Sequence, residues 1–114
     1  FQRFFEDYDL LLCPGNAVPP FPLETLYCDE INGQKLSNYI EWLGIASAIT
    51  LTGHPVTMVP IGLDHTGAPI GVQVVGPKRH SDAFTLACAG EIELLLQTDP
   101  STKRPIPTLE HFNR

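Results

Sequence analysis

The chain has 114 residues, and its 7 Lys and Arg against 13 Asp and Glu give a net charge of −6. An acidic chain lacks the positive field that attracts phosphate backbones, so nucleic acid is not an expected partner. No segment approaches the roughly 20 apolar residues needed to span a bilayer, which excludes a membrane anchor. With 43% hydrophobic residues, the length suits about one small domain with a packed core.

The start of the chain indicates whether it is part of a longer protein, and its cysteines indicate the redox environment. The chain begins at Phe1 without a Met and leads directly into an apolar segment, so we expect a piece of a longer polypeptide. Cys13, Cys28 and Cys88 form an odd set with spacings of 15 and 60, which is no disulfide framework. Reduced cysteines are typical of a cytoplasmic protein.

The first half of the chain predicts a strand, a long loop and a helix. Residues 1–7 resemble the end of a helix, and residues 8–13 form a short apolar run that Pro14-Gly15 stops, as expected of a buried strand. Residues 16–36 contain several prolines and predict a long loop. A helix then follows, with Asn38 as its cap and Gly53 just past its end.

The second half predicts a hairpin and a second helix. Strands at residues 56–61 and 70–75 are joined by turn residues, and Pro60 is expected at a strand end, a bulge or an edge. Gln73 is interpreted as an outward-facing strand residue. A broadly apolar helix begins near Ser81, and it needs cover from more than one neighbour.

This order predicts an α/β fold with a small mixed sheet and flanking helices. A strand–helix–strand crossover implies parallel pairing of the first two strands, and the hairpin adds an antiparallel third. We expect residues 1–97 to form the domain and residues 98–114 an extended, Pro-rich tail. So few elements make a thin core, whose exposed apolar surface favours a homo-oligomer or association with a missing part.

No familiar catalytic or cofactor motif is present. The four histidines and three cysteines lack the spacing of metal ligands, and the glycines do not spell a dinucleotide fingerprint. We therefore expect no metal and no cofactor. Ser47 lies on the predicted inner face of the first helix, either bonded back to the preceding turn or lining a pocket.

Two blocks of sequence resemble the carboxy-terminal segment of the amidase signature family. Residues 51–60 contain Gly53-x-Pro55 and end in Val-Pro, and the second block reads Gly67-x-Pro69-x-Gly71-x-Gln73-x-x-Gly76. The family also tends to carry Tyr-Asp before an apolar strand ending in Pro, as at Tyr8-Asp9 and Pro14, and an acidic residue at the next helix, as at Asp82. This resemblance extends over residues 1–97 and implies that the chain is part of the larger amidase-signature fold.

The resemblance implies hydrolysis of a small carboxamide by a Ser–cis-Ser–Lys triad. That triad belongs to a Gly/Ser-rich segment which matches no position here, so we expect no catalytic residue in the chain and no activity from the chain alone. Carried over by position, the substrate-binding candidates are Pro14, Tyr39, Leu43 and Ser47. The family's usual Asn is replaced by Thr50. Leu43 stands where glutamine-transamidating members carry an acidic residue, which favours a plain amide hydrolase.

Three alternatives remain open. The chain could be a non-catalytic binding or assembly module that keeps the amidase tail fold. A second alternative is a subunit of a glutamine-dependent amidotransferase. The third is a self-contained α/β domain that binds a ligand through the loop at residues 16–36.

Overall fold

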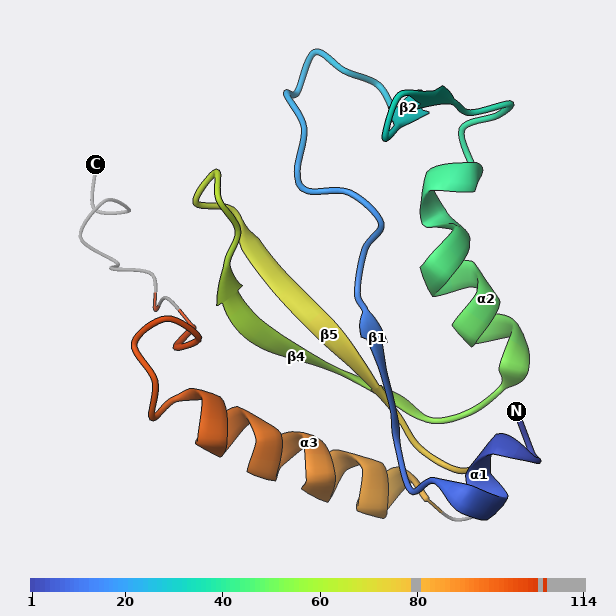
Figure 1. Ribbon diagram of the computed structural model, residues 1–114, viewed down its shortest axis with the longest axis vertical. Helices are drawn as coiled ribbons and strands as arrows, with labels where there is room; N and C mark the ends of the chain where they lie inside the picture. Colours follow the sequence, from blue (N-terminus) through green and yellow to red (C-terminus); the bar gives the residue numbers. More distant parts are fainter. Residues whose placement is uncertain (79–80, 105, 107–114) are drawn as a thin grey trace, which may run out of the picture.

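A computed structural model describes residues 1–78, 81–104 and 106, and shows a three-stranded sheet flanked by helices (Figure 1). The α/β class expected from the sequence is confirmed. The elements in chain order are α1 (Phe4–Asp7), β1 (Leu11–Pro14), β2 (Glu30–Ile31), β3 (Gln34–Lys35), the 3₁₀ helix η1 (Glu41–Leu43), α2 (Gly44–Thr52), β4 (Val56–Leu63), β5 (Pro69–Val75) and α3 (Asp82–Leu96).

The strand order in the main sheet is β1-β5-β4, and both pairings are antiparallel. The expected direct pairing of the first two strands is therefore wrong. β1 and β4 run in the same direction, as a crossover requires, but β5 lies between them. The physical reason is that the tight turn after β4 returns the chain along the edge of β4 that would otherwise meet β1, so both neighbours pair with β5.

The hairpin of β4 and β5 follows its sequence signals. Gly67 has a φ of 84°, and its N–H donates to the carbonyl of Asp64 at 3.0 Å. The ladder shifts register between Pro60 and Gly62, as expected of a proline that has no N–H to donate. Gly62 has a φ of 117°, a conformation that side chains rarely adopt.

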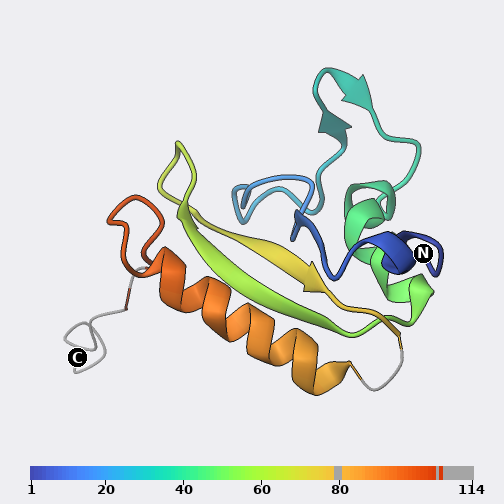
Figure 2. The ribbon, with the colours of Figure 1, turned by 60° about the horizontal axis from the view of Figure 1, so that its bottom comes forward.

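One face of the sheet packs against α3, which runs beneath it in Figure 2. The buried apolar cluster between the sheet and α3 consists of Val59, Val74 and Ala89, with four half-buried apolar neighbours around it, Leu10, Val72, Ile92 and Leu96. The outer face of α3 stays exposed: Leu94 and Leu95 are 65% and 70% exposed. Among the described residues, the sheet covers one side of α3 and leaves these apolar side chains exposed.

The predicted C-terminal end of the first long helix is confirmed, but Asn38 does not cap it, because the residues before η1 and α2 are Ile40 and Leu43 and neither makes a side-chain cap bond. The side chain of Asn38 accepts a hydrogen bond from the N–H of Ile40 at 3.0 Å, and Glu41 accepts one from the N–H of Ser37 at 2.8 Å. Gly53 ends α2 with a φ of 65°. The first turn is the 3₁₀ helix η1, and α2 proper begins only at Gly44.

The long loop at residues 16–36 contains an unpredicted hairpin. β2 and β3 pair through Glu30 with Lys35 and Ile31 with Gln34. The turn between them is Asn32-Gly33, with φ values of 52° and 78°. Asn-Gly is a common two-residue hairpin turn, because both residues tolerate positive φ, so a usable signal was present. This small hairpin projects from the rest of the molecule (Figure 2).

After α3, the chain forms a turn in which Asp99 accepts hydrogen bonds from the N–H and hydroxyl of Ser101. The carbonyl of Ser101 lies against Gly62 in β4. Of the tail expected at residues 98–114, position 105 and positions 107–114 lie outside the described residues. No helix in the described part of the chain has the length and the apolar sequence to cross a membrane.

Candidate functional site

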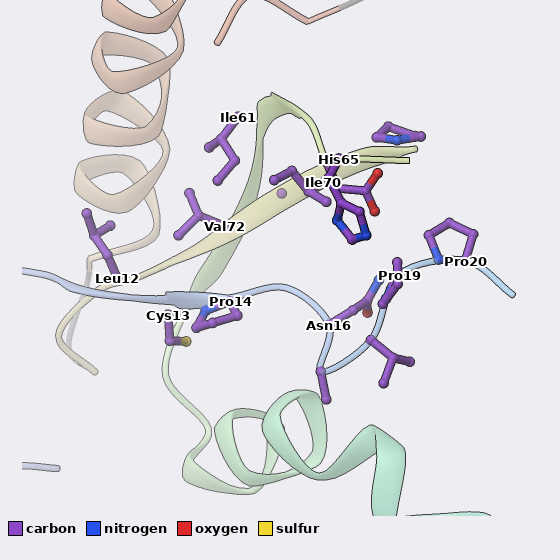
Figure 3. Close-up of a pocket in the computed structure, with 15 residues that line it drawn as sticks. Leu12, Cys13, Pro14, Asn16, Pro19, Pro20, Ile61, His65, Ile70 and Val72 are labelled. Atoms are coloured by element: carbon purple, nitrogen blue, oxygen red, sulfur yellow. The ribbon is translucent and has the colours of Figure 1, made fainter. Parts of the chain in front are cut away.

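A cavity of about 510 Å³ lies between the end of β1, the loop that follows it and the β4–β5 hairpin (Figure 3). Most of its lining is apolar, and the polar groups come from the loop and the hairpin turn. The lining residues are Leu12, Cys13, Pro14, Asn16, Ala17, Val18, Pro19, Pro20, Ile61, Asp64, His65, Pro69, Ile70, Gly71 and Val72.

The apolar wall of the cavity comes from the sheet. In Figure 3, Leu12, Ile61 and Val72 extend from their strands on the side of the sheet where α3 lies. Cys13, the next residue of β1, is directed to the opposite side of that strand, as side chains alternate along a strand (Figure 3). The cavity thus continues the apolar face of the sheet beyond the part that α3 covers, and suits an apolar group.

The side chain of Gln73 bonds the end of β1, where the chain leaves the sheet and begins to line the cavity. Its side chain is 6% exposed, and its Nε2 donates to the carbonyl of Pro14 at 2.9 Å and contacts the sulfur of Cys13 at 3.6 Å. The residue after Pro14, Gly15, donates its N–H to the carbonyl of Gly71 at 3.0 Å. The interpretation of Gln73 as an outward-facing residue is therefore wrong, because the chain after β1 covers it.

Gly15 allows this close approach. A Cβ at this position would lie 2.7 Å from Cε and 2.9 Å from Sδ of Met58, and 3.0 Å from the carbonyl oxygen of Gly71. Real Cβ atoms essentially never approach that closely, so only glycine fits without a shift. The wall that begins at Asn16 is therefore anchored by backbone and side-chain bonds on β5.

Asn16 and His65 lie at the end of the cavity away from Leu12 (Figure 3). Asp64 completes this polar end. Its Oδ1 accepts hydrogen bonds from the hydroxyl and N–H of Thr66 at 2.6 and 2.8 Å and from the N–H of Ala68 at 2.9 Å. The bond from the Thr66 hydroxyl is the main cause that holds the pKa of Asp64 below its usual value. The carboxylate is therefore ionised at neutral pH and shapes the turn.

The thiol of Cys13 is not an activated nucleophile. Burial raises the pKa of Cys13 above its ordinary value, so the protonated thiol predominates at neutral pH. In the part of the chain that the structure describes, no three His, Cys, Asp or Glu side chains gather as a metal site would require. The hydrogen bonds of the described residues include none from a serine hydroxyl to a His or Lys side chain.

Of the four substrate-binding candidates, the structure places only Pro14 on this cavity. Tyr39 lies just before η1, is 60% exposed, and packs edge-on against Tyr27 with ring centroids 6.2 Å apart. Leu43 and Ser47, in η1 and α2, are half-buried and do not line the cavity. The cavity residues that the sequence did not indicate, notably His65 and Ile70, belong to the hairpin and its turn.

Comparison with known proteins places most of the chain in one family. The family model described as Amidase matches residues 1–85. The chain is 33% identical to a fatty acid amide hydrolase of Arabidopsis thaliana over 90% of this chain and 16% of that protein. It is 38% identical to an indoleacetamide hydrolase of Bradyrhizobium diazoefficiens over 81% of this chain and 17% of that protein.

A third relative is named for a different activity. It is a glutamyl-tRNA(Gln) amidotransferase subunit of Streptococcus equi subsp. zooepidemicus, 33% identical over 78% of this chain and 17% of that protein. The chain thus spans about a sixth of the length of these relatives. No solved structure matches it significantly.

Proposed function

Since the chain belongs to the amidase family, we propose that it acts as the carboxy-terminal part of a carboxamide hydrolase. In this role it supplies the three-stranded sheet and one wall of the substrate pocket. The nucleophile and its base come from a segment that matches no part of these 114 residues. The observation that carries the proposal is the apolar cavity beside Pro14, formed within the residues that match the family.

The chemistry of the cavity supports a binding role. Its walls are mainly Leu, Ile, Val and Pro side chains, and its polar end consists of Asn16, Asp64 and His65. Such a site binds an apolar group and orients it through a few polar atoms. Its lining within the described part of the chain includes no serine, lysine or activated thiol to attack an amide carbonyl. The substrate we propose is therefore a carboxamide with an apolar acyl group.

A second candidate is the catalytic subunit of a glutamine-dependent amidotransferase. The 33% identity to the Streptococcus equi subsp. zooepidemicus protein favours it. Leu43 argues against it, because the resemblance to transamidating members implies an acidic residue at this position. An apolar side chain there offers no acceptor for the ammonium or amide group of glutamine. We therefore rank it second.

The test is a chimera in which this chain replaces the matching segment of the Bradyrhizobium diazoefficiens indoleacetamide hydrolase. We expect the chimera to hydrolyse indoleacetamide with a kcat/KM within about tenfold of the natural enzyme, because both segments would supply the same sheet and wall. Ammonia release gives the rate, and thermal unfolding shows whether the chimera is folded. A folded chimera without turnover would contradict the proposal.

Two matched variants of the chimera separate the cavity from the fold. Ile70 lines the cavity and is 37% exposed, and Leu63 lies on the same hairpin, is 48% exposed and does not line it. Ile70→Asp is expected to raise KM at least tenfold, because an ionised carboxylate in the wall repels an apolar acyl group. Leu63→Asp is expected to leave KM unchanged. Equal effects of the two substitutions would exclude this cavity as the substrate wall.

A further inference from the structure

A second hollow, of about 450 Å³, lies where three segments distant in sequence meet. Figure 1 shows the start of the chain, the end of α2 and the segment after β5 at the same end of the molecule. The residues that line the hollow are Phe1, Gln2, Arg3, Thr52, His54 and Lys78. None of them belongs to the cavity beside Pro14, so this is a separate feature of the surface.

The charge of this hollow is opposite to that of the chain. The described residues contain five Lys and Arg side chains, and two of them, Arg3 and Lys78, line it. Among the residues that the structure describes, no Asp or Glu lines it. Among the described residues, neither cation has a carboxylate within ion-pair distance, the pair of Arg104 with Glu93 being elsewhere. Two cations without a counter-charge in an acidic protein favour an anionic ligand.

His54 gives the hollow an aromatic wall held in one orientation. Its ring packs against two rings that also contact each other, Phe5, with centroids 4.9 Å apart, and Phe1, with centroids 5.5 Å apart. Its Nδ1 lies 2.9 Å from the carbonyl oxygen of Gly76. Because a carbonyl oxygen only accepts, Nδ1 carries the proton and donates it, and this bond fixes the ring. The aromatic rings offer apolar contact beside the two cations.

We propose that this hollow binds a carboxylate that carries an apolar substituent. The guanidinium of Arg3 presents a planar pair of donors that matches a carboxylate, and Lys78 adds a point charge. The rings of His54 and Phe1 would contact the apolar substituent. This proposal is independent of amide hydrolysis, since it uses no residue of the cavity beside Pro14.

The experiment titrates the 114-residue chain with phenylacetate at constant ionic strength and follows the ring proton signals of His54 by NMR. Phenylacetamide, which has nearly the same shape without the charge, and inorganic phosphate, which has the charge without the ring, are titrated in parallel. We expect saturable shifts at His54 with phenylacetate, and at least tenfold weaker binding of both comparison ligands. Equal affinity for phenylacetamide or for phosphate would overturn the proposal, as would the absence of saturable shifts.

Two variants and one control locate the binding. Arg3→Gln and Lys78→Gln are each expected to weaken phenylacetate binding about two- to fivefold, the effect of losing one exposed charge pair. Lys35→Gln removes an exposed cation on β3, outside the hollow, and is expected to leave the affinity unchanged. An Arg3→Gln/Lys78→Gln double variant that binds phenylacetate as the natural chain does would overturn the assignment.

Discussion

Replacing Gly76 by Ala is expected to destabilise the fold by about 2–3 kcal/mol, the range of a strongly overpacked core position. A Cβ at Gly76 would overlap the hydroxyl of Thr85 and would lie 3.0 Å from the Cβ of Thr85. Thr85 is only 1% exposed, so its side chain cannot turn into solvent and the overlap is relieved only by repacking around α3. The backbone of Gly76 is also held in place by two hydrogen bonds. Its N–H donates to the carbonyl of Pro55 at 2.9 Å, and its carbonyl accepts from His54.

Chemical denaturation measures this effect, and two further variants control it. Gly90 lies inside α3, and a Cβ added to it would meet nothing within 4 Å, so Gly90→Ala is expected to stabilise the chain by up to about 1 kcal/mol. Adding Thr85→Ala to Gly76→Ala removes the overlapping hydroxyl. The double variant should therefore lose less stability than the two single variants lose in sum. A Gly76→Ala variant as stable as the natural chain would show that α3 does not pack on β5 as described.

Replacing Gln73 by Leu is expected to cost about 0.5–1.5 kcal/mol, because the part-buried hydrogen bond from its Nε2 to the carbonyl of Pro14 is lost. The loss should also loosen the wall that starts at Asn16, so hydrogen exchange at the N–H of Gly15 is expected to accelerate. Chemical denaturation and exchange measured by NMR test the two effects together. Gln34→Leu, on the exposed strand β3, is the matched control and should change neither.

For a second substitution at Gln73, the loss of stability is expected to depend on pH. Gln73→Glu places a carboxylate against the Pro14 carbonyl, and burial together with this contact raises the pKa of the new group. Protonated Glu can donate to the carbonyl, so the variant should be more stable relative to the natural chain at about pH 4 than at about pH 7. Equal destabilisation at both pH values would show that the bond to Pro14 does not hold the wall.

Features that depend on neighbouring residues were predictable from the sequence. Gly53 ends α2 because it tolerates positive φ, and the side chain of Asn38 accepts a hydrogen bond from Ile40, two residues later, in the turn before η1. The turn between β4 and β5 is likewise built from Asp64 and the four residues after it. Such interactions appear as short patterns, which explains why the end of α2 and the turn between β4 and β5 could be predicted, whereas α2 begins at Gly44, later than predicted.

Features that join distant residues could not be predicted in the same way. The contact of Gln73 with Cys13 spans 60 positions, and no local pattern shows that β5 inserts between β1 and β4. The cavity depends on this insertion, because the insertion brings the hairpin residues Ile70 and Val72 beside the wall after Pro14. The resemblance to the amidase family indicated Pro14 but not the hairpin residues. The roles of Tyr39, Leu43 and Ser47 in substrate binding remain predictions.

The proposal that the reacting groups lie outside this chain has one direct test. The chimera is treated with a serine-directed fluorophosphonate, digested, and analysed by mass spectrometry to locate the covalent label. The chain has four serines: Ser37, Ser47, Ser81 and Ser101. We expect the label on a serine of the hydrolase portion and on none of these four. A stoichiometric label on any of them, with loss of amide hydrolysis, would contradict the proposal.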